Sequence, residues 1–392
     1  MRPISKLKLD EHSFPLLKRT IANNVLAQRQ RKTVQVKVPD VLGIKLTNRC
    51  NLRCEHCYQW NDAGYHHHMS KAEQVKDLDI GVFERLLEDT RQAKSRLYLW
   101  GGEPLVHRHI KRILELLEAD PRETTICTNA HFIDKHIAQL CRVSPNLELL
   151  IAVEGFEAEH DGISGKGSFR KVMGEIENLG RLREIGAYQG KISVHTVIND
   201  NMVGRLYELM DLYERNGVDL VLLTFPWYIS EATSREMDEY VKEQFDWLID
   251  THAGRHTWDA FKYRLSTTNI DALMADLGRI NARLWRTKIR YQPELEFDEI
   301  EAFVDGRTMT ARCANKCGVL NTRVDVGPTG KVTACKFFSE FNVGDLHKQS
   351  IAEIWQSEAY GRVREILGKQ LSPACSKCNV LYLHAHSTPI HI

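Results

Sequence analysis

Short apolar segments alternate with segments of helical periodicity from residue 41 to about residue 228. The apolar runs are VLGIKL (41–46), RLYLW (96–100), TTICT (124–128), LELLIAV (147–153), KISVHTVI (191–198) and DLVLLTF (219–225). Such runs predict strands buried on both faces, and hence a parallel sheet. Six strand–helix repeats predict an α/β fold, a partial (β/α)6 barrel of the TIM type. In such barrels the chemistry takes place at the C-terminal ends of the strands.

The pattern changes twice after the sixth apolar run. Residues 229–312 have mainly helical periodicity and end in an extended piece, KIRYQPELEF (288–297). Further on, TRVDVGPTGKVTAC (322–335) predicts a β-hairpin around the turn GPTG, and residues 350–367 predict an amphipathic helix. The predicted organisation is an N-terminal extension (1–40), a barrel (41–228), a helical linker or insert (229–312) and a small α+β domain (313–392).

Composition and charge narrow the class of protein. The chain has 392 residues, 43% of them hydrophobic, and a net charge of +1. This balance gives no electrostatic footprint for nucleic acid or for an anionic membrane. No segment reaches the roughly 18 apolar residues of a membrane span, and the N-terminus lacks the apolar core of a signal peptide. We therefore expect a cytoplasmic protein whose ten cysteines are reduced and free to bind metal or react.

Three cysteines, Cys50, Cys54 and Cys57, directly follow the first predicted strand. Thiolates favour zinc, copper(I) and iron–sulfur clusters. A structural zinc site has four protein ligands, whereas a [4Fe–4S] cluster held by three cysteines leaves one iron open to another molecule. The alternative is a zinc knuckle in which His56, or one histidine of the run HHH (66–68), is the fourth ligand.

The C-x3-C-x2-C loop after a first barrel strand resembles that of the radical S-adenosylmethionine (SAM) superfamily. The resemblance implies a [4Fe–4S] cluster whose open iron binds the amino and carboxylate groups of SAM. It also implies that an electron from the cluster cleaves SAM to a 5′-deoxyadenosyl radical, which abstracts hydrogen from a substrate. The electron would come from a donor such as flavodoxin or ferredoxin, while the protein positions the reactants and excludes water.

Further motifs follow the next strands, as they do in the superfamily. WGGEP (100–104) corresponds to the family's GGEP motif, and TNA (128–130) stands where relatives commonly have TNG. Residues 153–169 resemble the SLDG…HD…G…SF segment, but Glu154 replaces the usual Asp and Ala152 replaces a Ser that commonly helps to bind SAM. By resemblance, the cofactor-binding residues are His56, Tyr58, Gly101, Gly102, Glu103, Asn129 and Glu154. Ser193, and with it His195, is a candidate to replace the missing Ser in binding SAM.

A second set of cysteines occupies the C-terminal region. It comprises Cys313, Cys317, Cys335, Cys375 and Cys378. Their arrangement around the hairpin and helix resembles the auxiliary-cluster module called SPASM, or its shorter twitch form. In the twitch form Cys317, Cys335, Cys375 and Cys378 would close a second, auxiliary [4Fe–4S] cluster. Four protein ligands leave no open iron, which suits electron transfer. The alternative is a structural zinc ribbon.

The resemblance implies an oxidoreductase, because auxiliary clusters accompany oxidative outcomes. We expect dehydrogenation or cross-linking of a small molecule or a peptide. Residues 1–40 are too few for the leader-binding domain of many peptide-modifying relatives, which favours a small molecule or a peptide recognised in another way. Two alternatives remain. One is a redox-neutral epimerase or lyase in which Cys127 or Cys313 donates hydrogen to the substrate radical, and the other is a non-enzymatic, zinc-stabilised binding protein.

Overall fold

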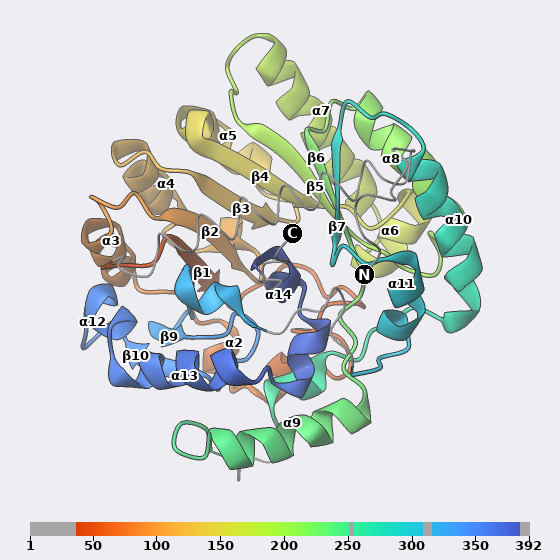
Figure 1. The fold of residues 1–392 in the computed structure, drawn as a ribbon. Coiled ribbons are helices and arrows are strands. Elements are labelled where there is room, and N and C mark those ends of the chain that lie inside the picture. The colour runs from red at the N-terminus through yellow and green to blue at the C-terminus, as the bar shows by residue number, and fades with distance from the viewer. Residues whose placement is uncertain (1–36, 251–254, 309–315, 385–392) are drawn as a thin grey trace, which may run out of the picture.

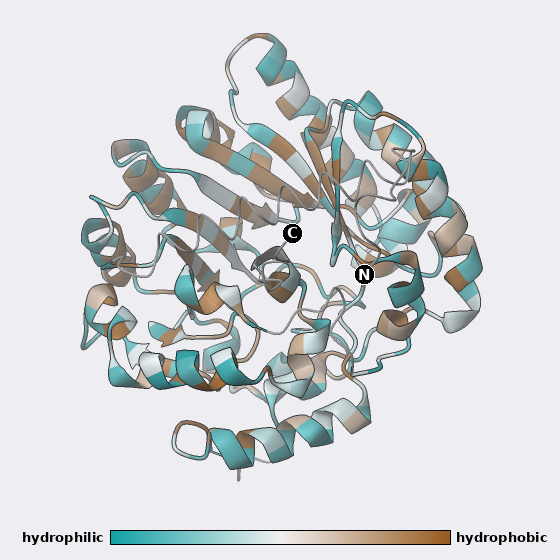
Figure 2. Cartoon of the chain, viewed as in Figure 1, coloured by the Kyte–Doolittle hydropathy of each residue, from teal (hydrophilic) through white to brown (hydrophobic). Residues whose placement is uncertain are grey.

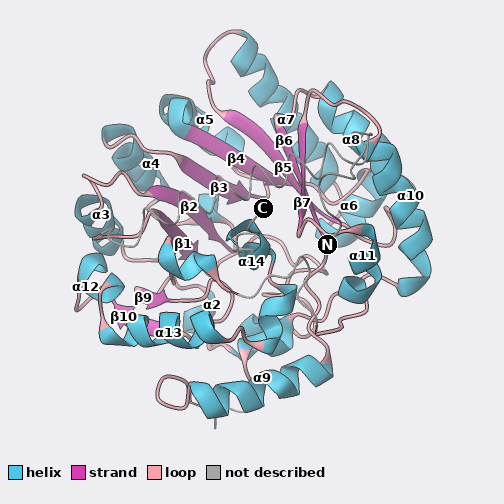
Figure 3. Cartoon of the chain, in the orientation of Figure 1, coloured by secondary structure: helices cyan, strands magenta, loops and turns pink. Residues whose placement is uncertain are grey.

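A ten-stranded sheet forms the centre of the molecule (Figures 1 and 3). The computed structural model describes residues 37–250, 255–308 and 316–384. Seven consecutive parallel strands curve into a partial barrel, which stays open because β1 pairs with β2 and β8 rather than with β7. These strands are β1 (Val41–Thr47), β2 (Arg96–Gly101), β3 (Thr124–Thr128), β4 (Leu147–Ala152), β5 (Lys191–Val197), β6 (Leu220–Thr224) and β7 (Lys288–Gln292).

Three C-terminal strands extend the same sheet beyond β1. Strand β8 (Arg323–Val326) lies parallel to β1, and β9 (Lys331–Thr333) and β10 (Asn342–Asp345) follow in antiparallel pairs. The predicted hairpin is therefore confirmed as β8 and β9. Because β8 adds directly to β1, the small C-terminal region is joined to the strand that precedes the first cysteine loop.

Helices cover the outer face of the barrel (Figure 1). The covering helices are α3 (Ile80–Asp89), α4 (Ile110–Ala119), α5 (Ile133–Val143), α7 (Ser168–Glu184), α8 (Leu206–Arg215) and α10 (Ile270–Asn281). Figure 2 shows hydrophobic residues concentrated on the strands and on the helix faces that pack against them. Asp79 begins α3 as an N-cap, since its side chain accepts hydrogen bonds from the amides of Gly81 and Val82.

The remaining helices are α2 (Lys71–Gln74), α6 (Glu157–Ser164), α9 (Glu231–Gln244), α11 (Phe297–Val304), α12 (Ile351–Trp355), α13 (Glu358–Lys369) and α14 (Asn379–His384). The single helix expected over 350–367 is two helices, because Ser357 caps a new helix by accepting a hydrogen bond from the amide of Tyr360. Among all the helices that the structure describes, none combines the length and apolar character needed to cross a membrane.

The two faces of the parallel strands differ in polarity. On β1, Leu42, Ile44 and Leu46 are fully buried in the core beneath the helices. Gly43 and Lys45 point the other way, into the barrel, where a Cβ atom on Gly43 would collide with side chains of β8. The register extends this inner face across the sheet through Tyr98 and Trp100 of β2, Cys127 of β3, and Ser193 and His195 of β5. The barrel interior is thus more polar than the apolar runs predicted.

Candidate active site

Two of the three cysteines that follow β1, Cys54 and Cys57, lie on one tight turn, and Cys50 precedes it. The amide of Cys57 donates to the carbonyl of Cys54 (3.1 Å), and the amides of Trp60 and Asn61 donate to the carbonyl of Cys57 (2.8 and 2.7 Å). These bonds close residues 54–61 into a compact turn shortly after the strand. The turn holds Cys50, Cys54 and Cys57 close to one another at the C-terminal end of the barrel.

The electrostatics of this turn suit a metal cluster. Burial, with a smaller contribution from the negative charge of Cys57, raises the pKa of both Cys50 and Cys54 to about 12. Burial also raises the pKa of Cys57. Three buried thiols can therefore ionise together only beside a compensating positive charge, which an iron cluster supplies. The donor set and its surroundings fit the predicted [4Fe–4S] cluster.

The glycines after β2 let two loops touch. The amide of Gly102 donates to the carbonyl of Thr47 (2.9 Å), and that of Glu103 donates to the carbonyl of Arg49 (2.8 Å). A Cβ atom on Gly101 would lie 2.6 Å from the carbonyl oxygen of Thr47, and one on Gly102 would lie closer still to that of Arg49. The GGEP segment is thereby bonded edge to edge with the start of the cysteine loop.

Glu103 connects this pair of loops to the loop after β3. Its fully buried carboxylate accepts hydrogen bonds from the amide of Leu105 (3.0 Å), the hydroxyl of Thr128 (2.8 Å) and the amide of Asn129 (2.7 Å). The Asn129 side chain in turn donates to Asn51 (2.9 Å) on the cysteine loop. Burial raises the pKa of Glu103 to about 7 despite these bonds. The loops after the first three strands therefore form one connected edge.

We expect Gly102→Ala to damage this edge, because the added methyl group would collide with backbone that no side-chain rotation can move. Overpacking of this kind costs about 1–3 kcal/mol of stability. Displacing the loop by about 1 Å would slow SAM cleavage by about 100-fold. A single-turnover SAM-cleavage assay, with chemical denaturation alongside, measures both effects.

Gly174→Ala is the matched control for this substitution. Gly174 lies in α7, and no atom lies within 4 Å of a Cβ built on it. This variant should keep full activity and gain about 0.5–1 kcal/mol, because alanine restricts the unfolded chain. Equal rates of SAM cleavage in the two variants would show that the close approach of the loops is not needed for SAM cleavage.

The C-terminal cysteines also lie near one another. Burial raises the pKa of Cys317 to about 12, with a further contribution from the charge of Cys375. Burial raises the pKa of Cys378 well above its usual range, and the charges of Cys335, Cys375 and Cys317 add to this effect. The amide of Cys378 donates to the carbonyl of Cys375 (3.0 Å), which places these two thiols on one turn.

Within residues 37–250, 255–308 and 316–384, no group of three or more His, Cys, Asp or Glu side chains is arranged to hold a single metal ion. Cys317, Cys335, Cys375 and Cys378 together provide the four thiolates that a [4Fe–4S] cluster without an open iron requires. Cys313 lies outside the described residues.

Two family models match the chain in these two regions. The model of the radical SAM superfamily matches residues 44–210. The model of SPASM, an iron–sulfur cluster-binding domain, matches residues 317–379. The chain therefore contains a radical SAM domain followed by a SPASM domain. The predicted cofactors are thereby confirmed: the radical SAM domain binds a [4Fe–4S] cluster and SAM, and the SPASM domain binds auxiliary iron–sulfur clusters.

Known relatives share most of this chain. Mycofactocin maturase MftC of Mycolicibacterium smegmatis is 25% identical over 353 residues, which cover 87% of this chain and 75% of MftC. The tungsten-containing aldehyde ferredoxin oxidoreductase cofactor-modifying protein of Pyrococcus furiosus is 22% identical over 356 residues, covering 86% and 87%. The structure of Streptococcus suis SuiB bound to precursor peptide SuiA matches with a TM-score of 0.57 at 16% identity, covering 90% and 74%. The predicted partial-barrel fold with a small C-terminal domain is confirmed.

Glu154 and His56 form a buried pair in the radical SAM domain. Their side chains approach to 3.4 Å, and the other Glu154 oxygen accepts from the amide of Val197 (2.9 Å). Burial alone would lower the pKa of His56, but the charge of Glu154 and the bond to it raise that pKa above its usual value. The second ring nitrogen of His56, Nδ1, is buried without a hydrogen-bond partner. The pair thus leaves one polar atom available for a bound molecule.

Tyr58 lies in an aromatic cluster that the sequence did not reveal. Its ring stacks on Phe261 at a centroid distance of 4.6 Å and meets the edge of Phe337 at 6.1 Å. Phe261 belongs to the segment predicted as a linker, and Phe337 follows Cys335 in the SPASM domain. Trp227 joins the same cluster, 4.0 Å from Phe337. Three distant segments therefore pack over the residue expected to lie against adenine.

Ser193 lies apart from the other predicted cofactor-binding residues. It is fully buried in the first half of β5, and its hydroxyl donates to Glu148 (2.6 Å). His195, two residues closer to the C-terminal end, contacts the Thr224 hydroxyl (2.9 Å). The structure thus does not bring Ser193 to the cysteine loop, and its role in binding SAM stays a prediction.

Cys127, the predicted hydrogen donor, points into the barrel. Its thiol donates to the hydroxyl of Tyr98 (2.8 Å). Burial raises the pKa of Cys127 to about 11, so the thiol is protonated at neutral pH.

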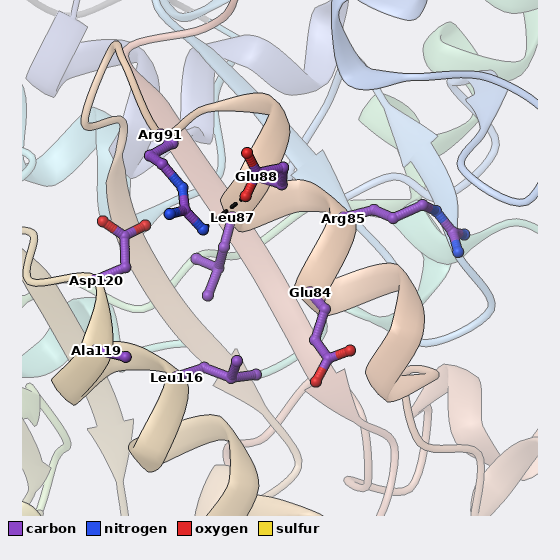
Figure 4. A pocket seen from close by; sticks show the side chains of 8 residues that line it. All are labelled: Glu84, Arg85, Leu87, Glu88, Arg91, Leu116, Ala119 and Asp120. Carbon is purple, nitrogen blue, oxygen red and sulfur yellow. Dashed lines mark ion pairs between the residues drawn. The ribbon is translucent and has the colours of Figure 1, made fainter.

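A groove between α3 and α4, lined by residues such as Glu84, Arg91 and Leu116, lies on the outer layer of the barrel (Figure 4). That groove is near the C-terminal ends of the two helices, away from the cysteine loop.

Proposed function

We propose that this radical SAM enzyme is an oxidoreductase that dehydrogenates or cross-links a small molecule or a peptide. The observation that carries the proposal is the contact between the SPASM domain and the barrel interior. Lys336, next to Cys335, lies over the rings of Tyr98 (4.6 Å) and Trp100 (5.3 Å) on the inner face of β2. An auxiliary cluster held by Cys335 would thus lie beside the barrel interior, where it could accept an electron from a substrate radical.

When bound, the clusters and SAM supply hydrogen abstraction and electron transfer. The residues of this chain hold and enclose them. Cys50, Cys54 and Cys57 would hold the first cluster, and the edge built on Glu103 would receive the methionine part of SAM. The aromatic cluster around Tyr58 and Phe261 would exclude water from the site.

The relatives support a peptide or a small molecule as substrate. One is named as a maturase and the other as a cofactor-modifying protein. The ten cysteines further support a reducing compartment, and we propose that the protein acts in the cytoplasm. We propose flavodoxin or ferredoxin as the electron donor. The proposed domain boundaries, 41–228 for the barrel and 313–392 for the auxiliary domain, enclose the two family-model matches.

The mass of the product tests the oxidative proposal. Cluster-loaded enzyme, SAM and dithionite are incubated with candidate peptides and metabolites, in water and in heavy water. Oxidation removes two hydrogens from the substrate, whereas a redox-neutral epimerase adds one deuterium in heavy water without other change. A product of unchanged hydrogen count would contradict the oxidative assignment.

A redox-neutral reaction is the second candidate, favoured by the position of the Cys127 thiol on the inner face of the barrel. A thiol there could return a hydrogen atom to the substrate. Under this candidate, Cys127→Ala would abolish deuterium incorporation while SAM cleavage continues. Under the oxidative proposal, the same variant should still form the dehydrogenated or cross-linked product.

The pH dependence of SAM binding tests the role of Glu103. Burial raises the pKa of its carboxyl group to about 7, so the group loses its charge as pH falls through neutrality. If the carboxylate accepts a hydrogen bond from the SAM amino group, the Kd for SAM should rise about tenfold between pH 8 and pH 6. Equilibrium binding to the cluster-loaded protein measures this. The Glu103→Gln variant should show no such slope, and identical slopes in both proteins would exclude the role.

A further inference from the structure

Two lysines and a tryptophan form a group of hydrogen-bond donors inside the barrel. Lys45 of β1 and Trp100 of β2 are register partners on the inner face. The Lys45 Nζ atom lies 5.7 Å from the centre of the Trp100 ring, and the Lys336 Nζ atom lies 5.3 Å from the same ring. Two ammonium groups from different domains therefore meet at one indole.

Neither lysine is paired with a carboxylate. Among the residues that the structure describes, Lys336 has no ion pair or hydrogen bond, and its ammonium group lies over the aromatic faces of Tyr98, Trp100 and Phe337, within electrostatic range of Asp325. Lys45 is 7% exposed, and its ammonium group meets the Tyr65 hydroxyl (2.8 Å) and His66 (3.3 Å), with the Cys57 thiol within electrostatic range. Neither ammonium group donates to a carboxylate within the described residues, so an anion bound beside them would gain two charged donors.

The indole of Trp100 supplies an independent second observation. Trp100 is 9% exposed, and its Nε1–H is buried without a hydrogen-bond partner. A buried indole N–H is normally satisfied, since leaving it unpaired costs free energy. The Trp100 Nε1–H thus adds a neutral donor to the ammonium groups of Lys45 and Lys336, which lie over the same ring.

The nearby carboxylates are already engaged. Asp325 forms a two-bond ion pair with Arg323 (2.6 and 2.8 Å), and Glu148 accepts from Ser193 (2.6 Å). Asp325 lies within electrostatic range of Lys336, but within the described residues neither carboxylate accepts a hydrogen bond from Lys45 or Lys336.

We propose that Lys45, Trp100 and Lys336 bind a carboxylate group of the substrate. This inference rests on the proposed function, since it assigns a substrate class to the same barrel interior. A carboxylate offers lone pairs to all three donors, and the carbon that carries it would lie against the aromatic walls of Tyr98 and Phe337. Peptides with an acidic side chain or a free C-terminus, and small organic acids, are the matching substrates.

Calorimetric titration of the anaerobic, cluster-loaded protein tests the site without requiring SAM cleavage. The probes are acetate, its neutral isostere acetamide and inorganic phosphate, at constant ionic strength. We expect acetate to bind one site per chain and acetamide not to bind. Lys336→Gln should weaken acetate binding at least about tenfold, and Trp100→Phe, which keeps the ring but removes the N–H, should weaken it as well.

Lys331→Gln is the matched control, because Lys331 lies on the same hairpin but is exposed and paired with Asp345 (3.0 Å). This variant should bind acetate as the wild type does. Three results would overturn the proposal: equal affinity in the Lys336→Gln and Lys331→Gln variants, equal binding of acetamide, or preference for phosphate over acetate. Loss of SAM cleavage with normal acetate binding would instead count against the proposed function alone.

Discussion

Replacing Cys50, Cys54 and Cys57 together with alanine should abolish SAM cleavage and remove about four irons per chain. Cys54 and Cys57 lie on one turn with Cys50 close by, and burial together with mutual repulsion makes ionisation of the three thiols unfavourable without a metal cluster. Without them nothing fixes a cluster at the C-terminal end of β1. Iron analysis and quantification of 5′-deoxyadenosine under dithionite measure the two losses.

Cys141→Ala is the control for this experiment. Cys141 lies in α5 on the outer layer, and it packs against the core without belonging to either cysteine group. We expect wild-type iron content and SAM cleavage in this variant. If the triple variant retained SAM cleavage, the cluster would have to be held elsewhere, and the assignment of the cysteine loop would be wrong.

Replacing Cys375 and Cys378 with alanine should leave SAM cleavage intact and stop formation of the oxidised product. Both thiols lie on one turn of the SPASM domain, within electrostatic range of Cys317 and Cys335. Removing two of four ligands should release about four irons. SAM cleavage should persist, because the first cluster lies on a different loop, but the oxidised product should disappear.

The two cysteine variants serve as controls for each other. The triple variant should keep the auxiliary iron that the Cys375/Cys378 variant loses, and the latter should keep the SAM cleavage that the former loses. Circular dichroism checks that the SPASM domain, whose β8 pairs with β1, remains folded. Undiminished oxidised product in the Cys375/Cys378 variant would remove the support for electron transfer through the auxiliary site.

The parts of the site that sequence predicts are those in which neighbouring residues act together. The cysteine loop and GGEP are contiguous motifs at strand ends, so locating the strands also located the motifs at one edge. The pairing of Glu103 with Asn129 follows from the adjacency of β2 and β3. Contiguous motifs and the parallel order of the strands are therefore enough to predict the part of the site built on β1, β2 and β3.

The remaining parts depend on long-range packing. The sequence indicated an extended piece at 288–297, but not that its first part joins the barrel sheet as β7, because KIRYQ is too polar to stand out as a buried strand. The stacking of Tyr58 on Phe261, and the contact of Lys336 with Trp100, join residues that are far apart in the chain. Sequence spacing gives no signal for such contacts, since they arise only when the 229–312 segment and the SPASM domain pack on the barrel.

Metal analysis of the anaerobically purified wild-type protein, combined with a SAM-cleavage assay under dithionite, tests the central claim most directly. We expect about eight irons per chain with matching sulfide, little zinc, and conversion of SAM to 5′-deoxyadenosine. About four irons with activity would mean that the C-terminal cysteines hold no iron cluster. Zinc alone, with no SAM cleavage after reconstitution with iron and sulfide, would exclude both iron–sulfur clusters and radical chemistry.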